Sequence, residues 1–153
     1  MARIPRSALP PTGVYHVTAR GVARCEIFVD DEDRASFLEL MRRAVRKWGW
    51  KCHAYCLMGN HYHLIVETQL MRLSEGFHHL NGVHAQRFNR RHGRVGHLFQ
   101  DRFHARVLRD DEHLAEACAY VWNNPVRAGL CAEAHDWDWS GRIGFRGADN
   151  RVA

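Results

Sequence analysis

The sequence predicts a single α+β domain of the ferredoxin-like type, an antiparallel sheet covered on one face by helices. The first observation is the spacing of the apolar residues. Segments with strand spacing and segments with helix spacing follow one another along the chain in the order β-α-β-β-α-β. The second is size, since 153 residues with 46% hydrophobic content make one domain with a substantial core. We expect a loose, proline-rich arm over residues 1–12, the domain over 13–145 and a flexible tail over 146–153. A further helix, which carries a tyrosine, follows the last strand.

The first strand and the first helix have clear local signals. Residues 13–20 alternate and include β-branched and aromatic side chains, which is typical of a strand. A helix is predicted over 31–48, where apolar residues recur at helical spacing. Asp30 suits its N-cap, acidic residues in the first turn complement the helix dipole, and Gly49 suits its end.

A β-hairpin and a second helix come next. Residues 50–58 and 61–67 predict two antiparallel strands joined by a glycine-asparagine turn. A second helix is expected over about 73–92, and a fourth strand lies within 103–109. The two hairpin strands are therefore expected side by side in the sheet.

The last predicted helix carries a tyrosine and an amide one turn apart. It begins near Asp111 and runs toward Asn123, and Pro125 disfavours its continuation past Asn124. Because Tyr120 and Asn124 are four residues apart, they share one side of the helix. That side can face the sheet, although a packing role for the tyrosine and a helix-ending role for the asparagine are the commoner ones.

Two histidines begin the strand over 61–67. Because successive side chains on a strand point to opposite faces, His61 and His63 share a face and Tyr62 points away from both. Paired imidazoles on a rigid strand are suitable metal ligands. The triplet alone leaves an ordinary pair of half-buried histidines as the alternative.

The charge of the chain favours a nucleic-acid partner. The net charge is +5, and all of the 22 basic residues except Lys47 and Lys51 are arginines. Arginine grips phosphate bidentately and stacks on bases, although a GC-rich coding sequence would also favour it. Phenylalanines and histidines are interleaved with arginines over residues 84–109, as in surfaces that bind single strands. The arginines that we assign to DNA contact are Arg87, Arg90, Arg91, Arg94, Arg102 and Arg106.

The five cysteines indicate a reducing cytoplasm, since they are odd in number and scattered. Cys52 and Cys56 have a zinc-like spacing, but no second pair follows at finger spacing, so we expect core thiols. No run approaches the roughly 20 apolar residues of a membrane span, and no signal peptide pattern follows Met1. We therefore expect a cytoplasmic protein without a membrane partner.

Four separated segments of the chain resemble the single-tyrosine HUH transposases, which are the IS200-like transposases. The segments are residues 15–21, 54–64, 96–103 and 120–130. They occur in the family's order, and the agreement spans roughly residues 13–140. The last segment contains Asn-Pro-Val-Arg-Ala-Gly-Leu and is most similar to the REP-associated tyrosine transposases.

The resemblance implies roles for individual residues. It assigns Tyr120 as a nucleophile that forms a 5′-phosphotyrosine bond with single-stranded DNA. It assigns His61, His63 and Asn124 as ligands of Mg²⁺ or Mn²⁺, and imidazole ligands favour tighter binding of Mn²⁺. The implied partner is single-stranded DNA with hairpins, either REP-like sequences or inverted repeats.

The chain also departs from the family and leaves questions open. Gly59 replaces the usual proline of the turn, and Tyr62 replaces an aliphatic residue. Gln100, in the third segment, joins the predicted DNA contacts. Three other functions remain open: a domesticated hairpin-binding protein that does not cut DNA, a protein that acts on RNA, and a metal-dependent hydrolase without a covalent step. The sequence does not decide between a monomer and a homodimer, or which group takes the tyrosine proton.

Overall fold

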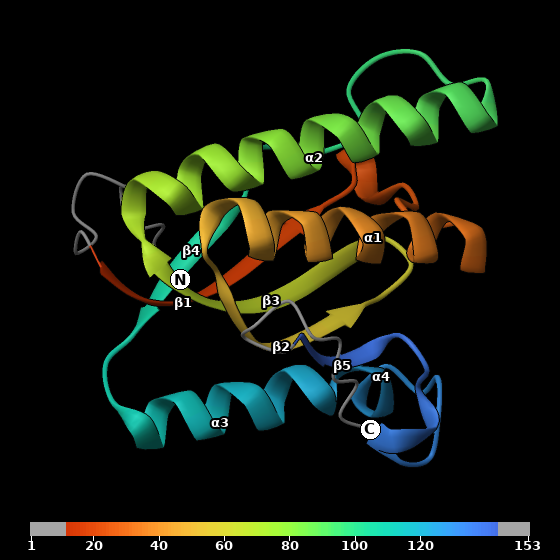
Figure 1. Ribbon diagram of the computed structural model, residues 1–153. Coiled ribbons are helices and arrows are strands. Elements are labelled where there is room, and N and C mark those ends of the chain that lie inside the picture. The colour runs from red at the N-terminus through yellow and green to blue at the C-terminus, as the bar shows by residue number, and fades with distance from the viewer. Residues whose placement is uncertain (1–11, 144–153) are drawn as a thin grey trace.

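The computed structural model describes residues 12–143, which form a five-stranded antiparallel sheet with helices on both faces (Figure 1). The strands are β1 (Thr12–Arg20), β2 (Lys51–Leu57), β3 (His61–Gln69), β4 (His104–Leu108) and β5 (Ser140–Ile143). The helices are α1 (Asp31–Trp48), α2 (Leu70–His92), α3 (Asp111–Trp122) and the single turn α4 (Asn124–Arg127), with 3-10 turns at Val22–Arg24 and Ala134–Asp136. The predicted arm and tail lie outside the described residues, except for Thr12, which begins β1.

The strand order is β4-β1-β3-β2-β5, and each neighbouring pair is antiparallel. The first four strands alternate with α1 and α2 as β-α-β-β-α-β, so the predicted ferredoxin-like plan is confirmed. No helix within residues 12–143 is both long enough and apolar enough to cross a bilayer.

Different helices cover the two faces of the sheet. α1 and α2 pack on one face and α3 runs across the other (Figure 1). β2 is therefore buried on both sides: Tyr55 and Leu57 belong to the larger core, and Ala54 and Cys56 to the smaller core under α3. The predicted layer of helices on one face consists of α1 and α2. The helix that carries the tyrosine, α3, covers the other face and adds a third layer.

The predicted ends of α1 are confirmed. The Asp30 side chain accepts a hydrogen bond from the backbone N–H of Asp33 at 3.1 Å. Gly49 ends the helix in the left-handed conformation with φ of 66°, which glycine adopts without steric cost.

Two short elements have no signal in the sequence patterns. β5 pairs with β2 at the edge of the sheet, and its four residues are too few to show alternation. α4 is one turn that contains Pro125 near its start, where the missing proline N–H is not needed.

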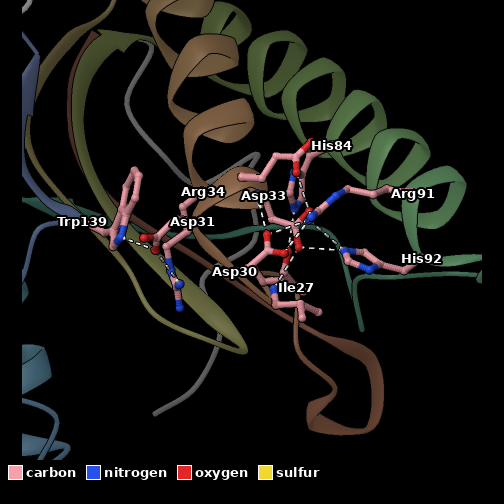
Figure 2. Close-up of polar contacts among 11 residues, drawn as sticks. Ile27, Asp30, Asp31, Asp33, Arg34, His84, Arg91, His92 and Trp139 are labelled. Carbon is pink, nitrogen blue, oxygen red and sulfur yellow. Dashed lines mark hydrogen bonds and ion pairs between the residues drawn. The ribbon is translucent and has the colours of Figure 1, made fainter.

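A buried carboxylate joins the start of α1 to the end of α2 (Figure 2). Asp33 is 4% exposed and accepts hydrogen bonds from the Val29 backbone N–H at 2.9 Å, from Arg91 at 2.7 Å and from His92 at 2.8 Å. Burial alone raises the pKa of Asp33, but these hydrogen bonds outweigh it and hold the pKa below its ordinary value. Arg91 also pairs with Asp30, so the two helix ends are tied by several charged contacts.

Replacing Asp33 with asparagine should lower the free energy of unfolding by about 2 kcal/mol, because hydrogen bonds to a charged group contribute about 1.5–3 kcal/mol. Urea denaturation at neutral pH measures this loss. As a control, Glu39→Gln removes an exposed partner of Arg43 on the same helix and should cost under about 1 kcal/mol. Equal unfolding free energies of the wild type and Asp33→Asn would contradict a stabilising role of the Asp33 carboxylate.

The difference in unfolding free energy between the wild type and Asp33→Asn should depend on pH. A carboxyl group whose pKa is lowered by folding stabilises the fold above its unfolded pKa, about 3.9 for aspartate, and this contribution is lost as the pH falls through the folded-state pKa. In urea denaturation, the difference in unfolding free energy between the wild type and Asp33→Asn should therefore become smaller as the pH is lowered below about 3.9.

Candidate active site

β3 places the two predicted histidines on one face of the sheet. The ring centroids of His61 and His63 are 5.1 Å apart. Tyr62 points the other way into the larger core, where it is fully buried and its hydroxyl donates to Asn81 Oδ1 at 2.7 Å. The predicted alternation is confirmed, and Tyr62 is on the opposite face from the histidines.

α3 brings Tyr120 to the face that carries the histidines. The helix is N-capped by Asp110, shortly after β4, and runs across the sheet (Figure 1). The Tyr120 ring centroid lies 5.9 Å from that of His63, and the residue is 50% exposed, so a substrate can reach it. The Arg127 guanidinium lies 3.9 Å from the centre of the Tyr120 ring and donates to the Tyr120 backbone carbonyl at 2.6 Å.

The break between α3 and α4 directs Asn124 toward the histidines. α3 ends one residue before Asn123, and α4 begins with Asn124 and Pro125. The Asn124 Nδ2 atom lies 2.9 Å from His63 Nε2, and the same side chain is hydrogen-bonded to His61. The structure thus brings the predicted amide and both predicted histidines together.

A third histidine, His16 of β1, belongs to this group and was not predicted. Its Nε2 lies 3.0 Å from His63 Nδ1, and its ring centroid is 6.1 Å from that of Tyr120. In the pairing of β1 with β3, Thr18 is opposite His63, which puts His16 two residues along on the same face. The signal that could have revealed it is a histidine on a neighbouring strand, but this becomes visible only when the register is known.

Burial keeps the three imidazoles neutral at neutral pH. It lowers the pKa of His63 to about 3, with further lowering by the neighbouring His16 and His61. It lowers the pKa of His16 to about 4, assisted by the charges of Arg106 and His113. The pKa of His61 is also lowered, first by burial and then by nearby positive charge. Neutral rings keep a lone pair for a metal ion or a hydrogen bond.

His61 and His63 open into a cleft of about 320 Å³. Its lining residues are Thr18, Ala19, Arg20, His61, His63, Gln100, Asp101, Arg102 and His104. A larger and more apolar groove of about 870 Å³ runs between α2 and residues 96–103 and shares Gln100, Asp101 and Arg102 with the cleft. Arg20, opposite His61 in the sheet register, is a charged lining residue that the sequence analysis did not assign.

The donor set of the cleft fits a divalent metal ion that completes its coordination with substrate oxygens. His61 and His63 offer two neutral imidazoles, and Asn124 offers an amide beside them. Within residues 12–143, no group of three or more histidine, cysteine, aspartate or glutamate side chains is arranged to hold a metal by itself. His61, His63 and Asn124 could therefore supply only part of a coordination shell.

The residues predicted to contact DNA fall into two groups. Gln100 and Arg102 line the cleft with the histidines, and Arg106 is exposed on β4 opposite His16 in the register. Arg90 is also exposed, toward the C-terminal end of α2. These side chains form no ion pair with another residue in 12–143, so they can contact a phosphate backbone without breaking one there.

Three other predicted arginines contact the protein itself. Arg87 donates to Ser36 Oγ at 3.1 Å, and Arg94 donates to the Gly96 carbonyl at 3.3 Å. Arg91 is paired with the carboxylates at the start of α1. Their role in DNA contact stays a prediction, and their observed contacts hold α2 and the following loop.

Comparison with known proteins gives one family and several relatives. The family described as IS200-like transposase matches residues 12–124. A Haemophilus influenzae protein that carries the name REP-associated tyrosine transposase is 24% identical over 139 residues, which cover 84% of this chain and 78% of that protein.

Two solved structures share the fold. A REP-associated tyrosine transposase bound to a REP hairpin superimposes with a TM-score of 0.71 at 17% identity, over 92% of this chain and 82% of that chain. A Deinococcus radiodurans R1 protein classed with transposases gives a TM-score of 0.51 at 16% identity, over 80% of this chain and 97% of that chain.

Proposed function

The chain belongs to the IS200-like transposase family, and from this premise we propose that it is a metal-dependent endonuclease and strand transferase for single-stranded DNA beside hairpins. The observation that carries the proposal is the convergence of Tyr120, His63 and Asn124, which come from α3, β3 and α4. A nucleophile and an amide that both contact a metal-binding imidazole at the edge of the cleft are the groups that a phosphotyrosine mechanism needs.

Tyr120 is the proposed nucleophile. Its Oη forms a bond to phosphorus while the bond between phosphorus and the 3′ oxygen breaks; the phenol loses a proton and the leaving oxygen gains one. The products are a 5′-phosphotyrosine and a free 3′-hydroxyl, and attack by a 3′-hydroxyl reverses the step, which permits rejoining. Phenols are weak nucleophiles at neutral pH because their ordinary pKa is about 10. Arg127 holds the ring and brings positive charge beside it.

His61, His63 and Asn124 are the proposed ligands of Mg²⁺ or Mn²⁺. When bound, such an ion would polarise the scissile phosphate and offset the charge that develops on it. The histidines are suited to this because burial keeps them neutral and the sheet holds them side by side.

The proposed substrate is a DNA hairpin with an adjoining single strand. The fold shared with a transposase bound to a REP hairpin supports this choice of partner. The cleft supplies Arg20 and Arg102 for phosphates, and the adjoining groove has the half-buried Phe99 in its lining, on which an unpaired base can stack.

Tyr120→Phe should fold and bind hairpin DNA but lose cleavage, because it removes only the hydroxyl of a half-exposed side chain. The assay incubates a labelled single strand carrying a hairpin with Mn²⁺ and measures cleavage and the covalent adduct on a denaturing gel. Tyr62→Phe is the matched control and should keep the adduct, since this hydroxyl bonds to Asn81 on the other face.

An adduct formed by Tyr120→Phe, or its loss in Tyr62→Phe alone, would disprove the assignment of the nucleophile. A wild-type protein that binds the hairpin and never cuts it would identify a domesticated binding protein. Cleavage without any adduct would identify a hydrolase.

The double variant His61→Ala/His63→Ala should lose Mn²⁺ binding, because it removes both imidazole ligands. Isothermal titration calorimetry measures the affinity, and circular dichroism checks the fold. His79→Ala removes an exposed imidazole from α2 and should leave the affinity unchanged. A folded double variant with wild-type affinity would refute the metal site.

Neutral substitutions of exposed arginines should weaken hairpin binding and reduce its salt dependence. For Arg90→Gln, Arg102→Gln and Arg106→Gln, each lost phosphate contact should flatten the slope of log affinity against log salt by about 0.7 for a single strand. Arg43→Gln changes an exposed arginine of α1 that pairs with Glu39 and serves as the control. An unaltered slope in the triple variant would exclude these residues from the interface.

A further inference from the structure

We propose that His16 is a positioning residue that fixes the ring of His63 in one tautomer and one orientation, with the Nε2 lone pair directed at the metal-binding position. The ligand role of His63 rests on the proposed function, whereas the role of His16 in fixing the ring can be tested without metal. The family match does not assign His16, and its part in the site emerges from the contact between β1 and β3.

A chain of hydrogen bonds determines where the proton of His63 lies. The amide nitrogen of Asn124 is 2.9 Å from His63 Nε2 and can only donate, so Nε2 must accept and carries no proton. A neutral ring then has its proton on Nδ1. The Nδ1–H donates to His16 Nε2 at 3.0 Å, which leaves the remaining proton of His16 on its own Nδ1.

His61 is held in a similar way by a different partner. Its Nδ1 lies 2.7 Å from Asn60 Oδ1, an oxygen that can only accept, so this nitrogen donates. Both histidines therefore have Nδ1 engaged by a neighbour, and the lone pair of each neutral ring is on Nε2. The amide nitrogen of Asn124 lies on that side of the His63 ring.

This arrangement matches a general feature of histidine ligands. A histidine that binds a metal through one nitrogen commonly donates its other N–H to an acceptor that fixes the ring, most often a carboxylate or a carbonyl oxygen. Here the acceptor for His63 is the imidazole of His16, held by a strand that pairs with β3 along its whole length. Asn124 Nδ2 donates to the lone pair of His63 Nε2. To act as a metal ligand, the Asn124 amide would turn and present Oδ1 in place of Nδ2.

Two variants separate the hydrogen bond from the volume of the side chain. His16→Phe keeps a ring of similar size and removes the acceptor, whereas His16→Gln restores an acceptor at about the position of Nε2. His79→Phe makes the same change at an exposed position of α2, where the ring contacts Trp48 of α1, and is the matched control.

The first measurement uses imidazole nitrogen NMR on the metal-free protein, which distinguishes the two neutral tautomers. We expect His63 to be protonated on Nδ1 in the wild type, in His16→Gln and in His79→Phe. In His16→Phe the Nδ1–H has lost its acceptor and the Asn124 amide can turn its oxygen toward Nε2, so we expect a mixture of tautomers. A wild-type His63 protonated on Nε2 would overturn the proposal, and so would an unchanged tautomer in His16→Phe. If His16→Phe does not fold, His16→Leu, which also removes the acceptor, takes its place, and an unchanged tautomer in that variant would overturn the proposal.

The second measurement is Mn²⁺ titration by calorimetry. His16→Phe should bind Mn²⁺ 10- to 100-fold more weakly, which is the usual loss when the partner of a ligating histidine is removed, and His16→Gln should recover most of it. Wild-type affinity in His16→Phe would overturn the positioning role. If the wild type itself binds no Mn²⁺, the proposed metal site fails, while the tautomer measurement still decides the role of His16.

Discussion

The pairing of β1 with β3 in the middle of the sheet is the constraint on which the site depends. The ladder runs from Thr12 opposite Gln69 to Arg20 opposite His61, so every side chain of one strand has a fixed neighbour on the other. A slip by one residue would turn the histidines to the opposite face and bury Tyr62 on the wrong side. Because helices cover both faces, such a slip would disrupt both cores, and the register is strongly specified.

The third layer exists because the sheet presents an apolar surface to α3. Ala54 and Cys56 of β2 and Ile65 of β3 pack there with Cys118 and Val121 of the helix. Burial raises the pKa of the Cys56 thiol to about 12, so this residue is a packing group and is unsuited to act as a nucleophile. The close packing of α3 is what brings Tyr120 within reach of the histidines and lets the next turn aim Asn124 at them.

Local signals predicted the elements well where the residues themselves specify the backbone. Asp30 and Gly49 define the ends of α1 through a side-chain cap and a left-handed backbone, which depend on neighbouring residues only. β5 had no such signal, because four residues stabilised by pairing with β2 carry too little pattern of their own. Similarly, the arginine pattern could not distinguish Arg91, which is tied to the carboxylates of α1, from the exposed Arg90.

The sequence by itself determined the order of β1 to β4 and of α1 to α3, and it placed His61 and His63 on one face because alternation along a strand is a local property of the backbone. Only the tertiary structure decided that α3 covers that face and that His16 contacts His63. These contacts join residues 47 or more positions apart, and their geometry comes from strand register and layer packing, which no short stretch of sequence encodes.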